Sequence, residues 1–524
     1  MSLKNSNVQT KAGVEAFSLD PLNSQAMSRH LTPALLALAL LVPFAPAGAQ
    51  TVPGKPLSLE EAVGLALKKN FDIQIQTFTT QNARESFNAS SAVFDPTLTS
   101  SITRSVSQAA SNTSRLDGAQ LEGPRNDGTT VRAGVSQRLA PTNGIIGLSA
   151  NLTRAATNSS NALLNPSFGN GLTATLSQPL LRNVGRESAT SASRRSKLGV
   201  DIALLGYTSR ILTVIAATET AYYNLVSARE TVRIRQLTLE RNQNLFDENT
   251  ARRATGVMTD LDVLTAEVGV ANARRALIIA QQTVADREDA LLNIINLPEF
   301  DSRPGPVKFD DFKGNVPSFA TSYKLARERF PDALTQQEAI KQFELDLIVA
   351  QKNLKPTLNL DASLGYTAKA TKDGYGGAIA NIPNDHGNNW SLGVNYSMPW
   401  GQQADKANHR SSLNTVRSQK VRLEQLEQTL IVNVRGAVRA VETQLVAVEI
   451  AAKATELSAR QYDLQKARFD AGLSTARLVL QAQEDLETAR FNELAAKVAL
   501  RQANGEVSRL EASSLGRYNV QLPQ

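Results

Sequence analysis

The chain has 524 residues, and its 56 Lys and Arg outnumber its 49 Asp and Glu, which gives a formal net charge of +7. Charged residues make up 20% and apolar residues 42%, a balance typical of a folded protein and not of a disordered polyelectrolyte. The absence of cysteine excludes disulfides, thiolate metal sites and cysteine nucleophiles. Three histidines do not favour a histidine metal cluster, and the small positive excess does not argue for a nucleic-acid partner.

Residues 1–49 are interpreted as a secretory signal with an over-long start. The basic stretch Met27–His30 precedes an apolar run, Leu31–Phe44, and small residues follow it up to Ala49. The run is too short to span a membrane as a helix, although a buried core helix is an alternative. We expect Met27 to be the initiator and cleavage to follow Ala49. No later uninterrupted apolar run reaches the length of a membrane helix.

The remaining chain is a tandem duplication. Pro96 and Pro356 each precede a predicted strand and lie 260 residues apart, and the motifs that begin at Gly256 and Gly472 lie 216 residues apart. Matches that keep their order along the chain are a strong repeat signal. The sequence therefore predicts a first repeat over 50–300, a linker over 301–317, a second repeat over 318–512 and a C-terminal tail over 513–524.

Each repeat is predicted to contain a helix, strands, a long helix, a tip and a second long helix. Residues 182–249 and 402–469 lack proline, so each can form a helix roughly 100 Å long at about 1.5 Å per residue. Apolar residues in the second of these recur at three- and four-residue steps, which predicts coiled-coil-like packing along one seam. They are Leu423, Leu426, Leu430, Val434, Val441, Leu445 and Val448.

The strand segments alternate as membrane strands do. Six strands are predicted, at 96–107, 131–139, 145–154, 172–179, 357–367 and 389–398. Their length of about ten residues suits a tilted membrane strand, and long connections alternate with short ones as in outer-membrane barrels. Trp390 and Trp400 flank the last strand, where membrane-interface aromatics are expected. A half-buried sheet in a soluble sandwich would show the same alternation.

These features together resemble the TolC-type outer-membrane efflux family, also called outer membrane factors. The matching segments are Leu57–Ala62, Leu65–Ala66, Asn70, Asp95–Pro96, Lys355–Pro356, Gln178–Arg182, Gly256–Ala266 and Gly472–Ala482. The resemblance implies an α+β membrane protein, the protomer of a trimeric outer-membrane β-barrel continued by a long periplasmic α-helical barrel, with a tandem structural repeat. It also implies a passive exit duct, without cofactor or metal, that docks on a periplasmic adaptor and an inner-membrane pump or ABC exporter.

The sequence departs from the family pattern in several places. The usual protomer gives four strands and a twelve-stranded trimer, whereas six strands here imply eighteen, unless the hairpin at 131–154 lies outside the barrel. Some members carry acidic residues six and nine positions after the second tip glycine, where this chain has Leu478 and Gln481. Residues that latch the closed pore in some members correspond here to Phe469 and Ser474. The acylated cysteine of many members is absent.

The resemblance assigns roles to several residues. The tips, spanning 255–262 and 471–478, are expected to dock the adaptor and to form the rim of the closable end. The docking residues are Thr255, Gly256, Val257, Met258, Thr259, Ala471, Gly472, Leu473, Ser474 and Thr475. The alternative for both tips is an ordinary helix-hairpin turn, in which glycine accepts the backbone angles that the turn needs.

A pore constriction is expected from Asp260, Asp262, Leu478 and Gln481, in which the two aspartates of three subunits form a charged ring. The alternative is that these acids stabilise a helix N-terminus. Pro179 and Pro399 are expected to end strands at the strand–helix joints. Arg132 and Arg138 either face the lumen or lie at strand ends in head-group water.

No catalytic motif is present, because HExxH, GxSxG and P-loop patterns are all missing from the sequence. His386 and His409 have no partners at a suitable spacing and are interpreted as surface residues. The competing interpretation of the whole chain is a soluble periplasmic coiled-coil adaptor or scaffold. Whether the export system is a drug efflux pump or a type I secretion system is left open.

Overall fold

The computed structural model describes residues 56–111, 123–296, 304–309, 316–370, 373–383 and 387–522. The expected signal at 1–49 lies outside these residues, as do His386 and parts of the expected linker and tail. In the first half the elements run in the following order. They are α1 (Leu59–Lys69), α2 (Phe71–Ser91), the 3₁₀ turn η1 (Ala92–Phe94), β1 (Thr97–Gln108), β2 (Arg125–Arg138), β3 (Ile145–Thr157), β4 (Ser167–Pro179), α3 (Arg186–Ala189), α4 (Ser191–Ala254) and α5 (Asp260–Ile295).

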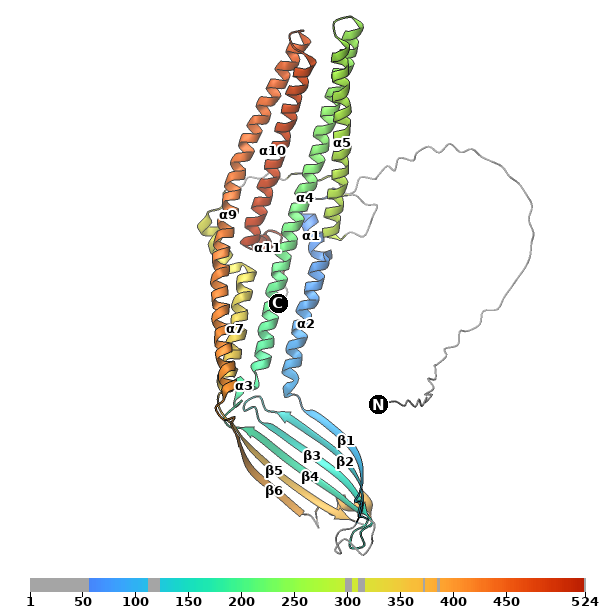
Figure 1. Ribbon diagram of the computed structural model, residues 1–524, viewed down its shortest axis with the longest axis vertical. Helices are drawn as coiled ribbons and strands as arrows, with labels where there is room; N and C mark the ends of the chain where they lie inside the picture. Colours follow the sequence, from blue (N-terminus) through green and yellow to red (C-terminus); the bar gives the residue numbers. More distant parts are fainter. Residues whose placement is uncertain are drawn as a thin grey trace, which may run out of the picture. The chain divides into compact units, whose positions relative to one another are not determined.

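The second half repeats this order with fewer strands. Its elements are α6 (Phe319–Arg329), α7 (Pro331–Lys352), β5 (Thr357–Ala370), α8 (Gly374–Ala380), β6 (Gly387–Ser397), α9 (Gln403–Asp470), α10 (Ala476–Leu510) and α11 (Ser514–Arg517). In both halves helices lead into strands and strands lead into a long helical hairpin, α4–α5 or α9–α10 (Figure 1). The structure therefore contains a tandem repeat.

The single helix expected at the start of each half is two helices. Ser58 and Glu61 form a capping box on α1, in which each side chain accepts the other's backbone N–H at 3.1 Å. Asn70 ends α1 in an extended conformation and then caps α2, because its side chain accepts the N–H of Asp72. In the second half Pro331 occupies the first turn of α7, where a missing N–H costs nothing.

All six strands form one antiparallel sheet in chain order, β1-β2-β3-β4-β5-β6. The hairpin of β2 and β3 pairs with β1 on one side and β4 on the other, so it belongs to the sheet and does not lie apart from it. Several strands are longer than the sequence indicated. β2 begins at Arg125 and not at 131, because the polar residues 125–130 continue the backbone pairing without apolar alternation.

One face of the sheet is apolar across all six strands. Residues in register on this face form cross-strand rows, and one row consists of Leu98, Val135, Leu148, Ala174, Leu364 and Trp390. Leu98 is 81% exposed, so nothing in the described part of the chain covers this face at β1. The opposite face is polar, and on it the Asp361 carboxylate accepts hydrogen bonds from Ser177 at 2.6 Å and Asn395 at 2.5 Å.

The helices pack around three groups of buried residues. One group lies where α1 meets α4 and α5, and it includes Leu59, Ile215 and Leu291. A second group joins α9 to α10 and α6, with Leu430, Val434 and Val441 of the expected seam at its centre. The third group, described below, lies at the tips. Of the other seam residues, Leu445 is exposed, so the seam is only partly buried within one chain.

Two further features differ from the sequence expectation. Residues after 513 are not a simple tail, because α11 is helical and Tyr518 donates a hydrogen bond to Glu219 of α4 at 2.6 Å. Among the described residues, α4 contains one 18-residue stretch, of mean hydropathy 1.5, that is long and apolar enough to cross a membrane by length and composition. This stretch was not predicted, because up to two charged residues lie within it and it is not a continuous apolar run.

Candidate functional site: the helical tips and the sheet

The two tips have the same backbone conformation. Gly256 and Gly472 both have a φ of +77°, in the left-handed region that glycine adopts without a steric penalty. In the first tip the N–H of Gly256 bonds the carbonyl of Arg253 at 2.9 Å and that of Val257 bonds Arg252 at 3.0 Å. The second tip repeats both bonds from Gly472 and Leu473. This pattern is a Schellman motif, which ends α4 and α9 and reverses the chain.

Both tips expose an apolar residue directly after the glycine. In a Schellman motif this residue usually packs back on its own helix. Here Val257 and Leu473 are each 71% exposed. The next exposed apolar residues along the first hairpin, Leu261 and Leu264 of α5, follow at helical spacing. Each tip therefore presents apolar surface that no described residue of its own chain covers.

The expected constriction residues make contacts within their own hairpins. Asp262 accepts the N–H of Thr259 at 3.2 Å and its hydroxyl at 2.6 Å, so it forms a capping box at the start of α5. Asp260 pairs with Arg253 across the turn. On the second hairpin Leu478 is exposed, and Gln481 donates to Asp485 at 3.3 Å. Asp262 thus occupies the helix N-terminal role considered as the alternative.

Four charged residues join the two hairpins close to their tips. The Nζ of Lys466 on α9 lies 2.7 Å from Glu248 on α4 and 2.6 Å from Asp470. Arg252 on α4 pairs with Glu248 and lies 3.7 Å from Asp470. We call Glu248, Arg252, Lys466 and Asp470 the tip network. The only sequence signal for it is the four-residue spacing within each helix, because the pairing between helices depends on the fold.

Phe469 lies beneath the tip network and is fully buried. The Arg252 guanidinium carbon lies 4.9 Å from its ring centre and Lys466 Nζ lies 5.5 Å from it, so the two cations cover the aromatic face. Leu245, Ala266, Ala476 and Val479 complete the apolar cluster. Phe469, which corresponds to a residue that latches the closed pore in some family members, thus lies at the apolar centre of the tips. Ser474, the other such position, accepts a hydrogen bond from Gln465 at 2.5 Å.

Farther from the tips, a half-buried ion pair links the two hairpins. Arg235 of α4 pairs with Glu487 of α10, and its guanidinium also stacks on Phe491, 4.5 Å from the ring centre. Burial raises the pKa of the Glu487 carboxyl, and the nearby Arg235 charge opposes that shift. The pair therefore fixes the register of α4 against α10 at some cost in desolvation.

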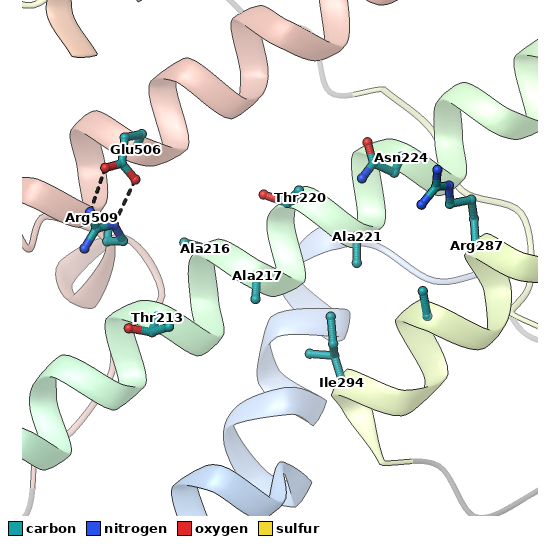
Figure 2. Close-up of a pocket in the computed structure, with 11 residues that line it drawn as sticks. Thr213, Ala216, Ala217, Thr220, Ala221, Asn224, Arg287, Ile294, Glu506 and Arg509 are labelled. Atoms are coloured by element: carbon teal, nitrogen blue, oxygen red, sulfur yellow. Dashed lines mark hydrogen bonds and ion pairs between the residues drawn. The ribbon is translucent and has the colours of Figure 1, made fainter. Parts of the chain in front are cut away.

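A cavity of about 500 Å³ lies between α4, α5 and α10 (Figure 2). The α4 side is formed by small residues, Thr213, Ala216, Ala217, Thr220 and Ala221. On the α10 side Arg509 and Glu506 face each other, with donor–acceptor distances of 2.6 and 2.8 Å. Hydrogen bonding to Glu506 raises the pKa of Arg509.

The joints between sheet and helices carry ion pairs of their own. β4 ends at Pro179 and β6 ends two residues before Pro399. Just beyond the first joint, Arg182 bonds Asp405 of α9 at 3.3 Å. Trp390 and Trp400 are both exposed, at the start of β6 and beyond its end. Arg132 and Arg138 lie on the polar face of the sheet, in the alternation opposite to Val131.

His409, singled out from the sequence, lies in α9 and belongs to neither the tips nor the sheet. Its side chain is partly buried. Among the described residues no group of three or more His, Asp or Glu is placed to hold a metal ion.

An antiparallel sheet with an exposed apolar face, joined to helical hairpins of this length, defines the class of outer-membrane channel proteins. The family model described as outer membrane efflux protein matches residues 129–297 and 322–511, which is more than half of the chain. The chain belongs to this outer membrane efflux protein family. The soluble adaptor or scaffold considered from the sequence is therefore set aside.

Two curated relatives share about a quarter of their aligned residues with the chain. One is the pyoverdine export outer membrane protein OpmQ of Pseudomonas aeruginosa, 24% identical over 301 residues, which are 56% of this chain and 60% of that protein. The other is OpmQ of Pseudomonas putida, 23% identical over 336 residues, 61% of this chain and 67% of that protein. The matched part of the chain thus spans about three fifths to two thirds of these relatives.

Solved structures share the fold at lower identity. The outer membrane channel CmeC of Campylobacter jejuni has a TM-score of 0.63 at 17% identity and covers 89% of this chain and 90% of its own. The open state of the outer membrane channel MtrE of Neisseria gonorrhoeae has a TM-score of 0.61 at 18% identity. This match covers 86% of the present chain and 88% of the MtrE chain.

Proposed function

We propose that this protein is the outer-membrane exit duct of a tripartite export system, through which solutes pass passively to the exterior. The observation that carries the proposal is a six-stranded sheet, apolar on one face and polar on the other, joined to helices about 100 Å long. The apolar face meets lipid and the polar face lines water. The helices extend the conduit through the periplasm.

Three copies close the barrel. β1 and β6 are the two edges of the sheet, and every residue of both strands is exposed. Unpaired edge strands in lipid leave backbone groups without partners, so they require closure. Pairing of β6 with β1 of the next copy satisfies both edges, and three copies of a six-stranded sheet make an eighteen-stranded barrel. Such a barrel is wider than one of twelve strands.

The tips dock a periplasmic adaptor that leads to an inner-membrane pump or ABC exporter. Val257 and Leu473 give each copy two apolar contact points at equivalent positions of the two repeats. Three copies present six such points in a ring. A pseudo-sixfold ring of small apolar contacts suits a partner that binds both hairpins in the same way.

The tip network holds the two hairpins of each copy together and thereby restricts the inner end of the duct. Each of its four residues pairs with two of the others, and Glu248 pairs with Arg252 of its own helix and with Lys466 of α9. Separation of α9 from α4 breaks the pairs that join the two helices, Lys466 with Glu248 and Arg252 with Asp470, and exposes Phe469. The names of the curated relatives, which refer to pyoverdine export, make a small secreted molecule the first cargo to examine for this chain.

Cross-linking of the two edge strands tests the proposal, and the natural absence of cysteine leaves no background. Cysteines are placed in pairs, one on β1 (Thr99→Cys, for example) and one on β6 (Ser391→Cys), and membranes are treated with a short bifunctional maleimide. We expect covalent dimers and trimers and no larger species. The matched control carries Ser149→Cys of the central strand β3 with Ser391→Cys and gives monomers. Monomers throughout the edge-strand panel, in protein that fractionates with the outer membrane, would overturn the proposal.

A further inference from the structure

Three arginines lie on the apolar face of the sheet, near the ends of the strands that are farthest from the helices. β1 leads away from η1 and β2 returns, so Arg104 and Arg125 lie near the turn between them. Arg154 lies near the end of β3, which also leads away from the helical side. Charge is costly on the lipid-facing side of a membrane strand, except near its ends.

The strand register brings these arginines together. Arg104 is opposite Thr129, and Thr129 is opposite Arg154, so the two arginines lie in one cross-strand row. Neighbouring strands are about 4.8 Å apart, which puts the two backbones about 10 Å apart. Arg125 lies four residues before Thr129 on β2, and alternation places it on the same face.

One carboxylate serves all three arginines. Arg104 holds Asp127 through two hydrogen bonds, Nη2 at 2.9 Å and Nε at 3.3 Å, and its side chain is still 68% exposed. Arg125 and Arg154 also lie close enough to Asp127 to interact with its charge. Asp127 is the only acidic residue of β1, β2 and β3, so the three arginines and this carboxylate leave these strands an excess of two positive charges on this face.

Aromatic packing marks the same level of the sheet. Phe168 is directly opposite Arg154 in the register. Its ring meets Tyr375 of α8 edge-to-face, with the ring centres 5.1 Å apart. α8 contacts both β4 and β5 here. Aromatic rings beside cationic side chains are typical of the boundary between acyl chains and head groups.

We propose that Arg104, Arg125 and Arg154 bind the phosphate groups of an anionic lipid head group in the outer leaflet of the membrane. This rests on the proposed function, since it requires the apolar face to meet lipid. A guanidinium binds phosphate oxygens through two parallel N–H bonds, and three of them around one carboxylate leave donors for a phosphorylated glycolipid such as lipid A. In a closed trimer the neighbouring β6 brings no carboxylate that would neutralise the cluster.

Lipid binding to purified trimers tests the inference. Native mass spectrometry in detergent measures binding of diphosphorylated lipid A and, separately, of phosphatidylcholine, whose head group has no net charge. The test variant is Arg104→Gln, Arg125→Gln and Arg154→Gln combined. The control is Arg132→Gln with Arg138→Gln, which removes two arginines from the polar face of β2. Arg154→Lys retains the charge but not the paired donors.

We expect the triple variant to lose about tenfold or more in affinity for lipid A while its phosphatidylcholine binding is unchanged. The control should bind both lipids as the original protein does, and Arg154→Lys should lie between them. Inorganic phosphate at millimolar concentration should not displace lipid A. Equal lipid A binding by the triple variant and the original trimers, an equal loss in the control, or full displacement by inorganic phosphate would overturn the inference. Loss of trimers and of both lipids from the original protein would instead count against the exit-duct proposal.

Discussion

The ammonium group of Lys466 on α9 lies 2.7 Å from the carboxylate of Glu248 on α4, close to both tips. The two residues are 218 positions apart in the chain and belong to different repeats. Their side chains are about one third exposed, 32% and 28%, and Arg252 and Asp470 extend the pair into a network. A network of partly shielded charges contributes more than isolated surface pairs do.

Lys466→Ala is expected to loosen the inner end of the duct. Discounted for solvent screening, the lost pairs contribute about 0.5–1 kcal/mol per copy, which shifts an equilibrium between joined and separated hairpins about two- to fivefold. Single-channel recording of trimers in planar bilayers should show a larger mean conductance, most clearly at low salt. Lys453→Ala, which breaks an exposed pair with Glu456 within α9, is the control and should leave the conductance unchanged.

Substitution of either tip glycine is expected to destabilise its turn. At Gly256 and Gly472 a Cβ would meet no atom within 4 Å, so the cost of alanine arises from the φ of +77° alone. That cost is about 1–2 kcal/mol for each residue. Thermal unfolding followed by circular dichroism should show a lower midpoint for Gly472→Ala. Gly436→Ala within α9, which also meets no atom, should raise the midpoint or leave it unchanged, since alanine favours a helix.

Glu487 gives a pH dependence of known sign. Because burial raises its pKa in the folded protein, the unfolded chain ionises first as the pH rises. The contribution of Glu487 to the free energy of unfolding therefore decreases as the pH rises from about 4.3, the ordinary pKa of glutamate, through the raised pKa of the folded protein. The side chain of Glu487→Gln cannot ionise. The unfolding midpoint of this variant should therefore rise relative to that of the original protein between pH 4 and pH 7.

Glu187→Gln serves as the comparison of opposite sign. Its pKa is lowered because Lys352 donates a hydrogen bond to the carboxylate. The ionised group stabilises the fold above the ordinary pKa, and this stabilisation is lost as the pH falls through the lowered pKa. The unfolding midpoint of Glu187→Gln should therefore lie below that of the original protein at pH 7 and equal it in acid. If the unfolding midpoints of the two variants changed with pH in the same way, the assigned pKa shifts of Glu487 and Glu187 would both be contradicted.

The two faces of β6 should differ in their tolerance of charge. Leu392 lies on the apolar face and is 65% exposed, whereas Ser391 lies on the polar face beside Ser363. Leu392→Arg is expected to cost about 2–4 kcal/mol near the middle of the bilayer. It should reduce the amount of trimer in outer-membrane fractions on unheated gels, and Ser391→Arg should leave it unchanged. An equal loss from both would show that β6 does not face lipid.

The sequence was sufficient for those features that periodicity and punctuation determine. Alternation predicted six strands, and the absence of proline between 402 and 469 predicted the long helix α9 within a residue at either end. The strand ends could not be predicted, because residues such as Asn126 and Asp127 pair through their backbones and show no apolar alternation. A break in a helix at Asn70 was also missed, since one residue ends α1 and caps α2.

The site was predicted less completely than the fold. Repetition located both tip turns, because a glycine recurs at the same place in each repeat and adopts the positive φ of the turn without a steric penalty. It did not reveal the pairing of Lys466 with Glu248, which depends on how two helices from different repeats lie against each other. The local capping role of Asp262 was predicted only as an alternative to the charged ring, and the capping box now accounts for its contacts within one chain.

Electron cryomicroscopy of the trimer in lipid nanodiscs tests the central claim most directly. The account predicts an eighteen-stranded barrel in which β6 of each copy pairs with β1 of the next, with Leu98 and Leu392 against lipid. A twelve-stranded ring, or a sheet whose apolar face is buried between copies, would contradict it.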